Sequence, residues 1–290
     1  MFRRLPREVS EEFRGWYWSE GALIPPYGFR LSASDVGGGF CDTGRHAYMK
    51  YVVKARETVG PRVERGRFIH EVFSEAVRAA KSILYQGAEL DGEGFRRAFM
   101  EMGETIFRRL AGRVGKVIDV RGVFDTLWSH AANTYASSLM RVKSRSPYLS
   151  VDGLVATVIP LVAEYPLDGS LIGLTRAIRA DALLYPSILV EIKTRELHPD
   201  HEVELAAYAL AFESQYEVPI DYAVLVNVKV HGDDFKVYEK VLPVSDEVRQ
   251  RFVEKRDALA KIVEEGLDPG KPPRCNPDCP FLEACAGYDR

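Results

Sequence analysis

The spacing of apolar residues divides the chain into a largely helical first half and a strand-rich second half. The first residues mix aromatic side chains with glycine and proline, and apolar residues then recur at helical spacing over 61–80. Two more helices are predicted at about 93–112 and 122–143, each with an apolar face and alternating charge. We therefore expect an N-terminal arm at 1–60 and a helical region at 61–150.

The pattern changes at Val151, where β-branched residues become frequent. Runs of this kind are typical of strands, and turn signals such as Asp168-Gly169 and Pro186-Ser187 separate them. Strands are predicted at 151–165, 171–185, 188–194, 221–230 and 235–244, the last two around a turn at 231–233. An amphipathic helix is predicted at 201–214, and a charged helix is predicted at 245–265.

The order of these segments is helices, a strand meander, a crossover helix, more strands and a last helix. It predicts an α/β fold in which helices flank a central mixed sheet and a helical region precedes it. The core is expected to span residues 151–265. A proline-rich tail at 266–290 closes the chain.

Composition excludes some classes of protein. No apolar run reaches 18 residues, so we expect no membrane span, and the N-terminal residues lack the apolar stretch of a secretory signal, so we expect a cytoplasmic protein. The formal net charge of −3 gives no sign of nucleic-acid binding, which would need a local basic cluster such as Arg62, Arg65 and Arg67. The scarcity of Asn and Gln suggests a hot environment.

Two carboxylates and a lysine stand out in the apolar strands. Asp181 lies in one strand, and Glu191 and Lys193 share a face of the next, because strand side chains alternate with a period of two. The turn at 186–187 would bring Asp181 beside Glu191. Carboxylates suit Mg²⁺ or Mn²⁺, which polarise phosphodiesters. An exposed salt bridge is the alternative, but the apolar flanks argue against it because buried charges are costly.

The predicted helices add three candidates. His70 lies on the helix at 61–80, and a neutral imidazole is a good Mn²⁺ ligand, although a histidine satisfied within its own helix is the commoner case. Glu204 and Tyr208 are four residues apart on a later helix and share a face. That face would contact a DNA phosphate or hold Lys193. A half-buried tyrosine of an amphipathic helix is the simpler interpretation.

The four cysteines fall at two places far apart in the sequence. Cys41 follows a glycine run, and Cys275, Cys279 and Cys285 lie in the tail. Four thiolates commonly ligate an iron–sulfur cluster, which is the preferred interpretation. Zinc, disulfides and inert buried thiols are the alternatives. A cluster would join the two ends of the chain and stabilise the fold by restricting the unfolded state.

Together these motifs resemble a known family. The ordered set consists of His70, Asp181, Glu191–Lys193 and Glu204-x-x-x-Tyr208, with the flanking cysteines. It resembles the RecB-like branch of the PD-(D/E)xK nucleases, and within that branch the CRISPR-associated iron–sulfur exonucleases. The N-terminal arm and the C-x₃-C-x₅-C tail are most similar to the variant subfamily found beside type I-A systems. The resemblance spans about residues 30–290 and implies a nuclease core at 151–265.

The resemblance implies a metal-dependent DNA exonuclease, often acting on single-stranded ends, that prepares DNA for the CRISPR integrase. The implied ligands of Mn²⁺ or Mg²⁺ are His70, Asp181, Glu191 and the backbone carbonyl of Ile192. Lys193 would be the catalytic lysine, Tyr208 would end the family's Q-x-x-x-Y motif, and the cysteines would hold a cluster, a [4Fe–4S] cluster by preference. Glu204 departs from that motif, and its charge would weaken DNA contact or add a metal ligand.

Two other functions stay open. Because of Glu204, a weakly catalytic or non-catalytic subunit that recognises DNA ends and docks the integrase is one alternative. A RecB-like iron–sulfur nuclease of recombination or repair is the other. The chain contains no GxxxxGK[ST] loop, so any helicase would be a separate protein.

Overall fold

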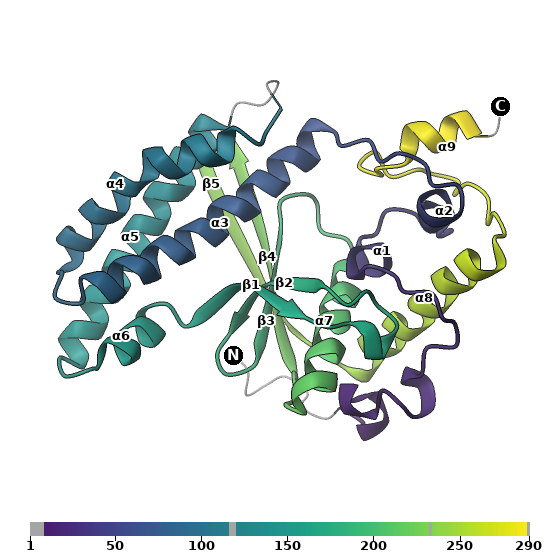
Figure 1. Ribbon diagram of the computed structural model, residues 1–290, viewed down its shortest axis with the longest axis horizontal. Coiled ribbons are helices and arrows are strands. Elements are labelled where there is room, and N and C mark those ends of the chain that lie inside the picture. The colour runs from purple at the N-terminus through teal and green to yellow at the C-terminus, as the bar shows by residue number, and fades with distance from the viewer. Residues whose placement is uncertain (1–8, 116–119, 232–233, 289–290) are drawn as a thin grey trace.

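A five-stranded mixed sheet forms the centre of the molecule in a computed structural model that describes residues 9–115, 120–231 and 234–288 (Figure 1). The strands lie side by side in sequence order: β1 (Leu161–Leu167), β2 (Ile178–Leu184), β3 (Ile188–Lys193), β4 (Tyr222–His231) and β5 (Asp234–Pro243). β3 and β4 run parallel, and the other neighbours are antiparallel. The predicted mixed sheet is confirmed. The turn predicted at Gly232 and Asp233 lies outside the described residues.

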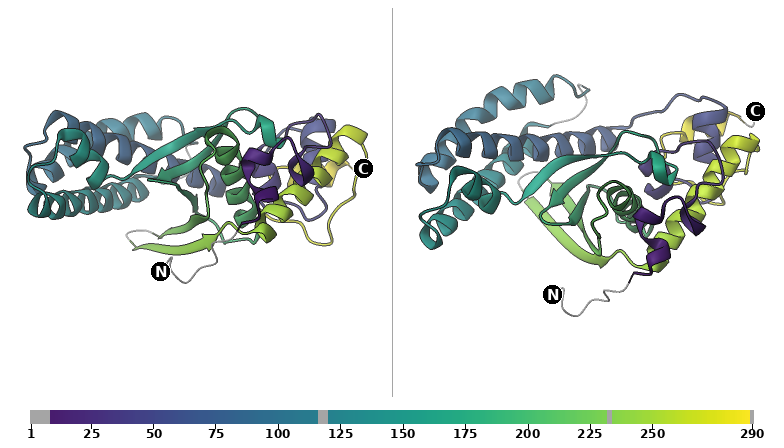
Figure 2. Two further views of the ribbon diagram at one scale, coloured as in Figure 1. Left: turned by 90° about the horizontal axis from the view of Figure 1, so that it is seen from below. Right: turned by 60° about the horizontal axis from the view of Figure 1, so that its bottom comes forward.

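Helices cover both faces of the sheet. On one face α3 (Pro61–Gln86), α4 (Gly92–Ala111) and α5 (Arg121–Arg145) pack into a core that includes Trp128 and reaches Ile192 of β3. These helices extend away from the sheet on the side opposite the C-terminal segment (Figure 2). The helices predicted at 61–80, 93–112 and 122–143 are confirmed, and the first continues to Gln86.

The other face carries α7 (Asp200–Tyr216) and α8 (Asp246–Glu265), which pack with the short α1 (Ala33–Gly37). α7 is the crossover that two parallel neighbouring strands require, here β3 and β4. Shorter elements are α2 (Arg45–Ala47), a π-helix at Tyr48–Val52, α9 (Leu282–Tyr288) and 3₁₀ turns at Glu11–Phe13, Gly15–Tyr17, Gly21–Leu23 and Ser170–Ile172.

The strand predicted at 151–165 is wrong in its first half. Val151–Val158 form the helix α6, and β1 begins at Leu161. Ser150 caps this helix, because its hydroxyl oxygen accepts a hydrogen bond from the Gly153 amide at 3.1 Å. Val155 and Val158 are buried in the core of α3–α5. Tertiary burial and a good N-cap therefore outweigh the strand preference of β-branched residues.

Buried ion pairs fasten the N-terminal arm to the core. Arg14 Nη1 lies 3.0 Å from Glu213 Oε1, and Arg249 Nη1 lies 2.6 Å from Glu213 Oε2. Arg256 Nη1 also donates a hydrogen bond to the carbonyl oxygen of Leu23 at 2.9 Å. These contacts join the arm, α7 and α8 across about two hundred residues of sequence.

The two ends of the sequence meet at one side of the molecule. The C-terminal α9 lies near α2 (Figures 1 and 2). Tyr48 and Met49 form a small buried cluster with Phe281 and Cys285. None of the helices in the described ranges combines the length and apolarity that a membrane crossing needs.

Candidate active site

The candidate lysine lies between two carboxylates where β3 meets α7. Lys193 Nζ is 2.7 Å from Glu191 Oε1 and 2.6 Å from Glu204 Oε2. Glu191 and Lys193 share a face of β3, as the period of two requires. Glu204 reaches the lysine from the helix that covers this face, so the lysine is fixed by two different elements.

Asp181 joins β2, β3 and α3. The β2–β3 hairpin places Ala182 opposite Val190, which brings the preceding Asp181 to the end of β3. Its Oδ2 accepts a hydrogen bond from the Ile192 amide at 2.6 Å, and its Oδ1 lies 2.8 Å from Nδ1 of His70 on α3. The hairpin thus brings together candidates that are far apart in sequence.

Tyr208 contacts the site through Glu204. Its side chain is buried, and its hydroxyl donates a hydrogen bond to Glu204 Oε1 at 3.3 Å. Burial and the nearby charge of Glu204 raise its pKa well above the ordinary value. Of the two roles considered for this helix face, the structure favours holding Lys193 through Glu204, because a buried phenol has no access to a phosphate.

The site carries more negative than positive charge. Glu191 and Glu204 bind the single ammonium of Lys193, and the carboxylate of Asp181 acts on Glu191 from the neighbouring strand. Burial, followed by the charge of Asp181, raises the pKa of Glu191 well above its usual range. Burial alone would lower the pKa of Lys193, but the charges of Glu191 and Glu204 raise it, so Lys193 stays protonated.

One oxygen of this site is conspicuous. Glu191 is 4% exposed, and its Oε2 has no hydrogen-bond partner in the described part of the chain. A buried carboxylate oxygen without a partner is costly unless another group binds it. Carboxylate oxygens and an imidazole are a donor set that suits Mg²⁺ or Mn²⁺, so the residues fit the predicted ion.

The predicted ligands do not form a ready-made metal cage. Among the described residues, no group of three or more His, Cys, Asp or Glu side chains is placed to hold an ion. The reason is that these groups bond to one another: His70 to Asp181, and Lys193 to Glu191. Binding would replace these contacts, and the metal ion stays a prediction.

Two residues that the sequence argument missed also shape the site. Asn227 on β4 donates hydrogen bonds to the carbonyl oxygens of Lys193 at 2.9 Å and Arg195 at 2.7 Å, which fixes the end of β3. Asn227 could have been singled out from the sequence, because it is a polar residue within a strand of β-branched residues. His201 is fully buried one turn before Glu204, and burial together with the charge of Lys193 lowers its pKa to about 3. Nothing in the sequence distinguishes this neutral histidine.

The four cysteines line one small cavity, and we call them the cysteine clasp (Cys41, Cys275, Cys279 and Cys285). All four thiols are free. Burial raises the pKa of the Cys279 and Cys285 thiols. For Cys41 burial is outweighed by hydrogen bonds with His46 and Thr43, which lower its pKa to about 6. Four thiols are the ligand type of an iron–sulfur cluster, although among the described residues the cysteines do not form a ready-made metal site. The cluster itself stays a prediction.

Comparison with known proteins identifies the family. The family model for "CRISPR-associated exonuclease Csa1" matches residues 2–288. The chain belongs to the Csa1 family. A Csa1 protein of Saccharolobus solfataricus is 36% identical over 285 residues, which cover 98% of this chain and 94% of that protein. A Csa1 protein of Thermoproteus tenax is 30% identical over 285 residues, covering 97% and 92%. No solved structure matches.

Membership of the Csa1 family confirms the resemblance to CRISPR-associated exonucleases that the motifs indicated. The match runs through both the candidate site and the cysteine clasp, because it covers nearly the whole chain. The roles assigned to individual residues rest on the resemblance and the geometry.

Proposed function

We propose that this Csa1-family chain is a metal-dependent exonuclease that hydrolyses DNA from single-stranded ends and processes it for CRISPR spacer acquisition. The observation that carries the proposal is the buried Oε2 of Glu191, which has no partner among the described residues and lies in a site with excess negative charge. The printed name of both relatives, exonuclease, supports the reaction class.

The side chains divide the chemistry among them. A bound Mg²⁺ or Mn²⁺ would polarise the scissile phosphodiester and lower the pKa of a water ligand. Glu191, Asp181, His70 and the carbonyl oxygen of Ile192 would hold the ion. The ammonium of Lys193 would orient the attacking water or neutralise charge that develops on the phosphate. Glu204 positions Lys193 through the contact of 2.6 Å.

The proposal includes a RecB-like core for the sheet and a [4Fe–4S] cluster in the cysteine clasp. The cluster would be structural, because it would fasten the segment around Cys41 to the C-terminal tail. The partners we propose are DNA ends and the CRISPR integrase, in the cytoplasm. The local excess of carboxylates supports the divalent metal ion, and the four thiols that line one cavity support the cluster.

A second candidate function rests on Glu204. Its carboxylate binds Lys193 at 2.6 Å. The Q-x-x-x-Y motif of the RecB-like nucleases that the sequence resembles has an uncharged glutamine at this position. A lysine held by two carboxylates contributes less positive charge to a bound phosphate. This contact favours a subunit that recognises DNA ends and docks the integrase with weak or no cleavage.

Digestion of end-labelled single-stranded DNA tests the proposal. With Mn²⁺ or Mg²⁺ the wild type should digest the strand, and Asp181→Ala and Lys193→Ala should each lose at least about a hundredfold in rate. Lys240→Ala is the matched control, because Lys240 makes an exposed ion pair with Glu202 and should digest normally. Wild-type rates in both site variants would refute the assignment. A wild type that binds DNA and the integrase without cleaving would favour the second function.

A further inference from the structure

Two cavities adjoin between the candidate active site and the cysteine clasp. One, of about 420 Å³, is lined by His70 and Lys193. The other, of about 720 Å³, is lined by Cys41 and Cys275. The linings share Phe40, Arg62, Gly66, Thr194, Arg195 and Asp278. The cavities therefore form one continuous groove, which we call the central groove.

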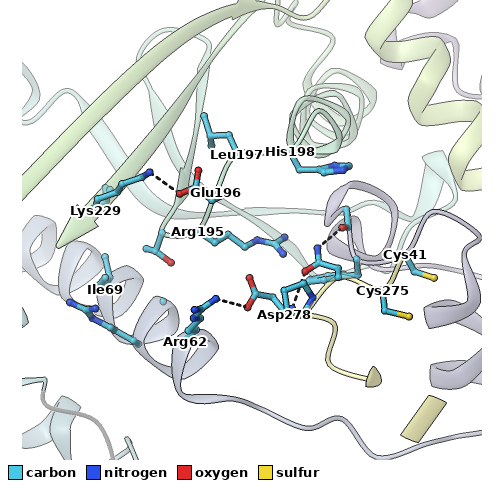
Figure 3. Close-up of a pocket in the computed structure, with 18 of the residues that line it drawn as sticks. Cys41, Arg62, Ile69, Arg195, Glu196, Leu197, His198, Lys229, Cys275 and Asp278 are labelled. Carbon is cyan, nitrogen blue, oxygen red and sulfur yellow. Dashed lines mark hydrogen bonds and ion pairs between the residues drawn. The ribbon is translucent and has the colours of Figure 1, made fainter. Parts of the chain in front are cut away.

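The walls of the central groove come from three parts of the sequence. Figure 3 shows Arg62 at the start of α3, Arg195 after β3 and Asp278 in the C-terminal tail, with Arg62 and Asp278 facing each other at 3.9 Å. Lys229 lies at one side, and Cys41 and Cys275 lie at the other. Two cysteines of the clasp thus line one part of the groove, and His70 and Lys193 of the candidate site line the other.

The central groove is positively charged although the chain is not. Five arginines and two lysines line it against four carboxylates, whereas the formal net charge of the chain is −3. Arg67 lines the half with His70, and Arg274 lines the half with Cys275. Both are exposed, and neither has an ion pair or hydrogen bond with the described residues. Such arginines suit the phosphates of a nucleic-acid backbone.

An aromatic ring lies at the middle of the groove. Phe40 is half-buried and borders both cavities as well as the small cavity of the clasp. The guanidinium of Arg195 stacks on it, with its carbon 4.7 Å from the ring centroid. A hydrogen bond also fixes Arg195, whose Nη2 donates to the carbonyl oxygen of Gly38 at 2.5 Å. A ring held by a cation in a basic groove is a suitable platform for an unpaired base.

A residue of the C-terminal tail, between two cysteines of the clasp, fixes the backbone beside Phe40. Asn276 lies between Cys275 and Cys279 and donates a hydrogen bond to the carbonyl oxygen of Gly39 at 3.0 Å. That contact fixes the backbone next to Phe40. The position of the ring therefore depends on the C-terminal tail, two hundred and thirty-seven residues away in sequence from Gly39.

We propose that the central groove binds one unpaired nucleic-acid strand, with a base stacked on Phe40 and phosphates contacted by Arg67 and Arg274. The inference rests on the proposed function, since the strand would lead its end to Lys193. A duplex fits the groove less well, because its bases are already stacked and paired. The Phe40–Arg195 pair is the specificity element that distinguishes the two.

Equilibrium binding of fluorescent oligothymidylate to the full chain, without added Mg²⁺ or Mn²⁺, tests the stacking contact. Phe40→Leu should weaken binding about tenfold, which is the effect of ~1.4 kcal/mol. Phe40→Tyr keeps a ring and should bind normally. Phe29→Leu, at a ring that packs on Tyr51 instead, should also bind normally.

An abasic strand of the same length separates stacking from damage to the clasp. Wild type and Phe40→Leu should bind it equally, because it offers phosphates but no base. A tenfold loss on the abasic strand as well would overturn the stacking role, as would equally tight binding of duplex DNA by the wild type.

The arginines are tested by salt dependence. For a single strand, log affinity decreases as log salt increases. This negative slope should become less steep by about 0.7 in Arg67→Ala and in Arg274→Ala, because each variant loses one phosphate contact. Arg97→Ala on α4 is the matched control, because Arg97 is exposed and lies outside the groove. Unchanged slopes in both groove variants would contradict the groove. Binding is measured without cleavage, so these results stand apart from failure or success of the nuclease assignment.

Discussion

At the scale of single residues, Glu204 is a charged side chain at the position where the Q-x-x-x-Y motif that the sequence resembles has a glutamine. Glu204 is buried, bonds Lys193 at 2.6 Å and accepts a hydrogen bond from Tyr208. A glutamine would keep the Lys193 contact through its carbonyl oxygen, and its amide nitrogen would donate to the Tyr208 hydroxyl oxygen, but it would carry no charge. Glu204 therefore positions Lys193 and also places a negative charge beside its ammonium.

We expect Glu204→Gln to digest single-stranded DNA faster, by up to about tenfold, because one negative charge near the phosphate is removed. Single-turnover rates on end-labelled DNA measure this. Glu202→Gln is the control on the same helix, since Glu202 pairs with exposed Lys240. A slower Glu204→Gln would show instead that the carboxylate contributes to the metal site.

Part of the site could be predicted from the sequence and part could not. The period of two placed Glu191 and Lys193 on one face, and the turn at 186–187 made Asp181 their neighbour; both are local rules. The pairing of Glu204 with Lys193 was one of two options, because sequence gives a helix face but not the strand it covers. Phe40 and Arg195 carried no signal, because their stacking joins segments 155 residues apart in sequence.

At the scale of elements, buried charge decides how the helices attach to one another. Glu213 on α7 has no exposed surface and binds Arg249 on α8 and Arg14 of the N-terminal arm. Its oxygens also accept hydrogen bonds from the Gly15 and Ile220 amides. One carboxylate thus binds two buried guanidinium groups. Its loss would leave Arg249 without a counter-charge and Arg14 with Asp221 alone, at 2.8 Å.

Glu213→Gln should lower the free energy of unfolding by about 3–5 kcal/mol, because it leaves buried charge uncompensated. Denaturant titration measures the change. Glu202→Gln should cost less than about 1 kcal/mol, since its pair with Lys240 is exposed. A comparably small loss in Glu213→Gln would mean that apolar packing alone fastens the arm.

The element scale also holds the clearest wrong prediction. Val151–Val158 have the composition of a strand but form α6. The local pattern could not show that these side chains pack on α3 and α5, whose own positions depend on the folded sheet. The β2–β3 hairpin was predictable, because its turn and alternation are local.

At the scale of the whole molecule, the cysteine clasp joins the segment after α1 to the tail after α8. Arg14 and Leu23 of the arm have contacts of their own, Arg14 with Glu213 and the carbonyl oxygen of Leu23 with Arg256. Loss of the clasp should therefore loosen the regions around α2 and α9 rather than the entire N-terminal arm.

Cys41→Ser tests the clasp. Anaerobically purified wild type should be brown, with broad visible absorption, and the variant should lose this colour. Hydrogen exchange should rise at Arg45–Ala47 and Leu282–Tyr288 and stay unchanged at Gly15–Tyr17, which is the internal control. Colourless wild type with stoichiometric zinc would overturn the iron–sulfur assignment but keep the clasp.

The whole account depends on the unpaired oxygen of Glu191. The direct measurement is the rate of single-stranded DNA digestion as Mn²⁺ is titrated, in wild type and in Glu191→Gln, which preserves shape and removes the charge. The wild-type rate should rise from near zero and saturate, and the variant should lose at least about a hundredfold at saturating Mn²⁺. Equal rates in the two proteins, or digestion by the wild type that does not depend on Mn²⁺, would contradict the proposed nuclease site.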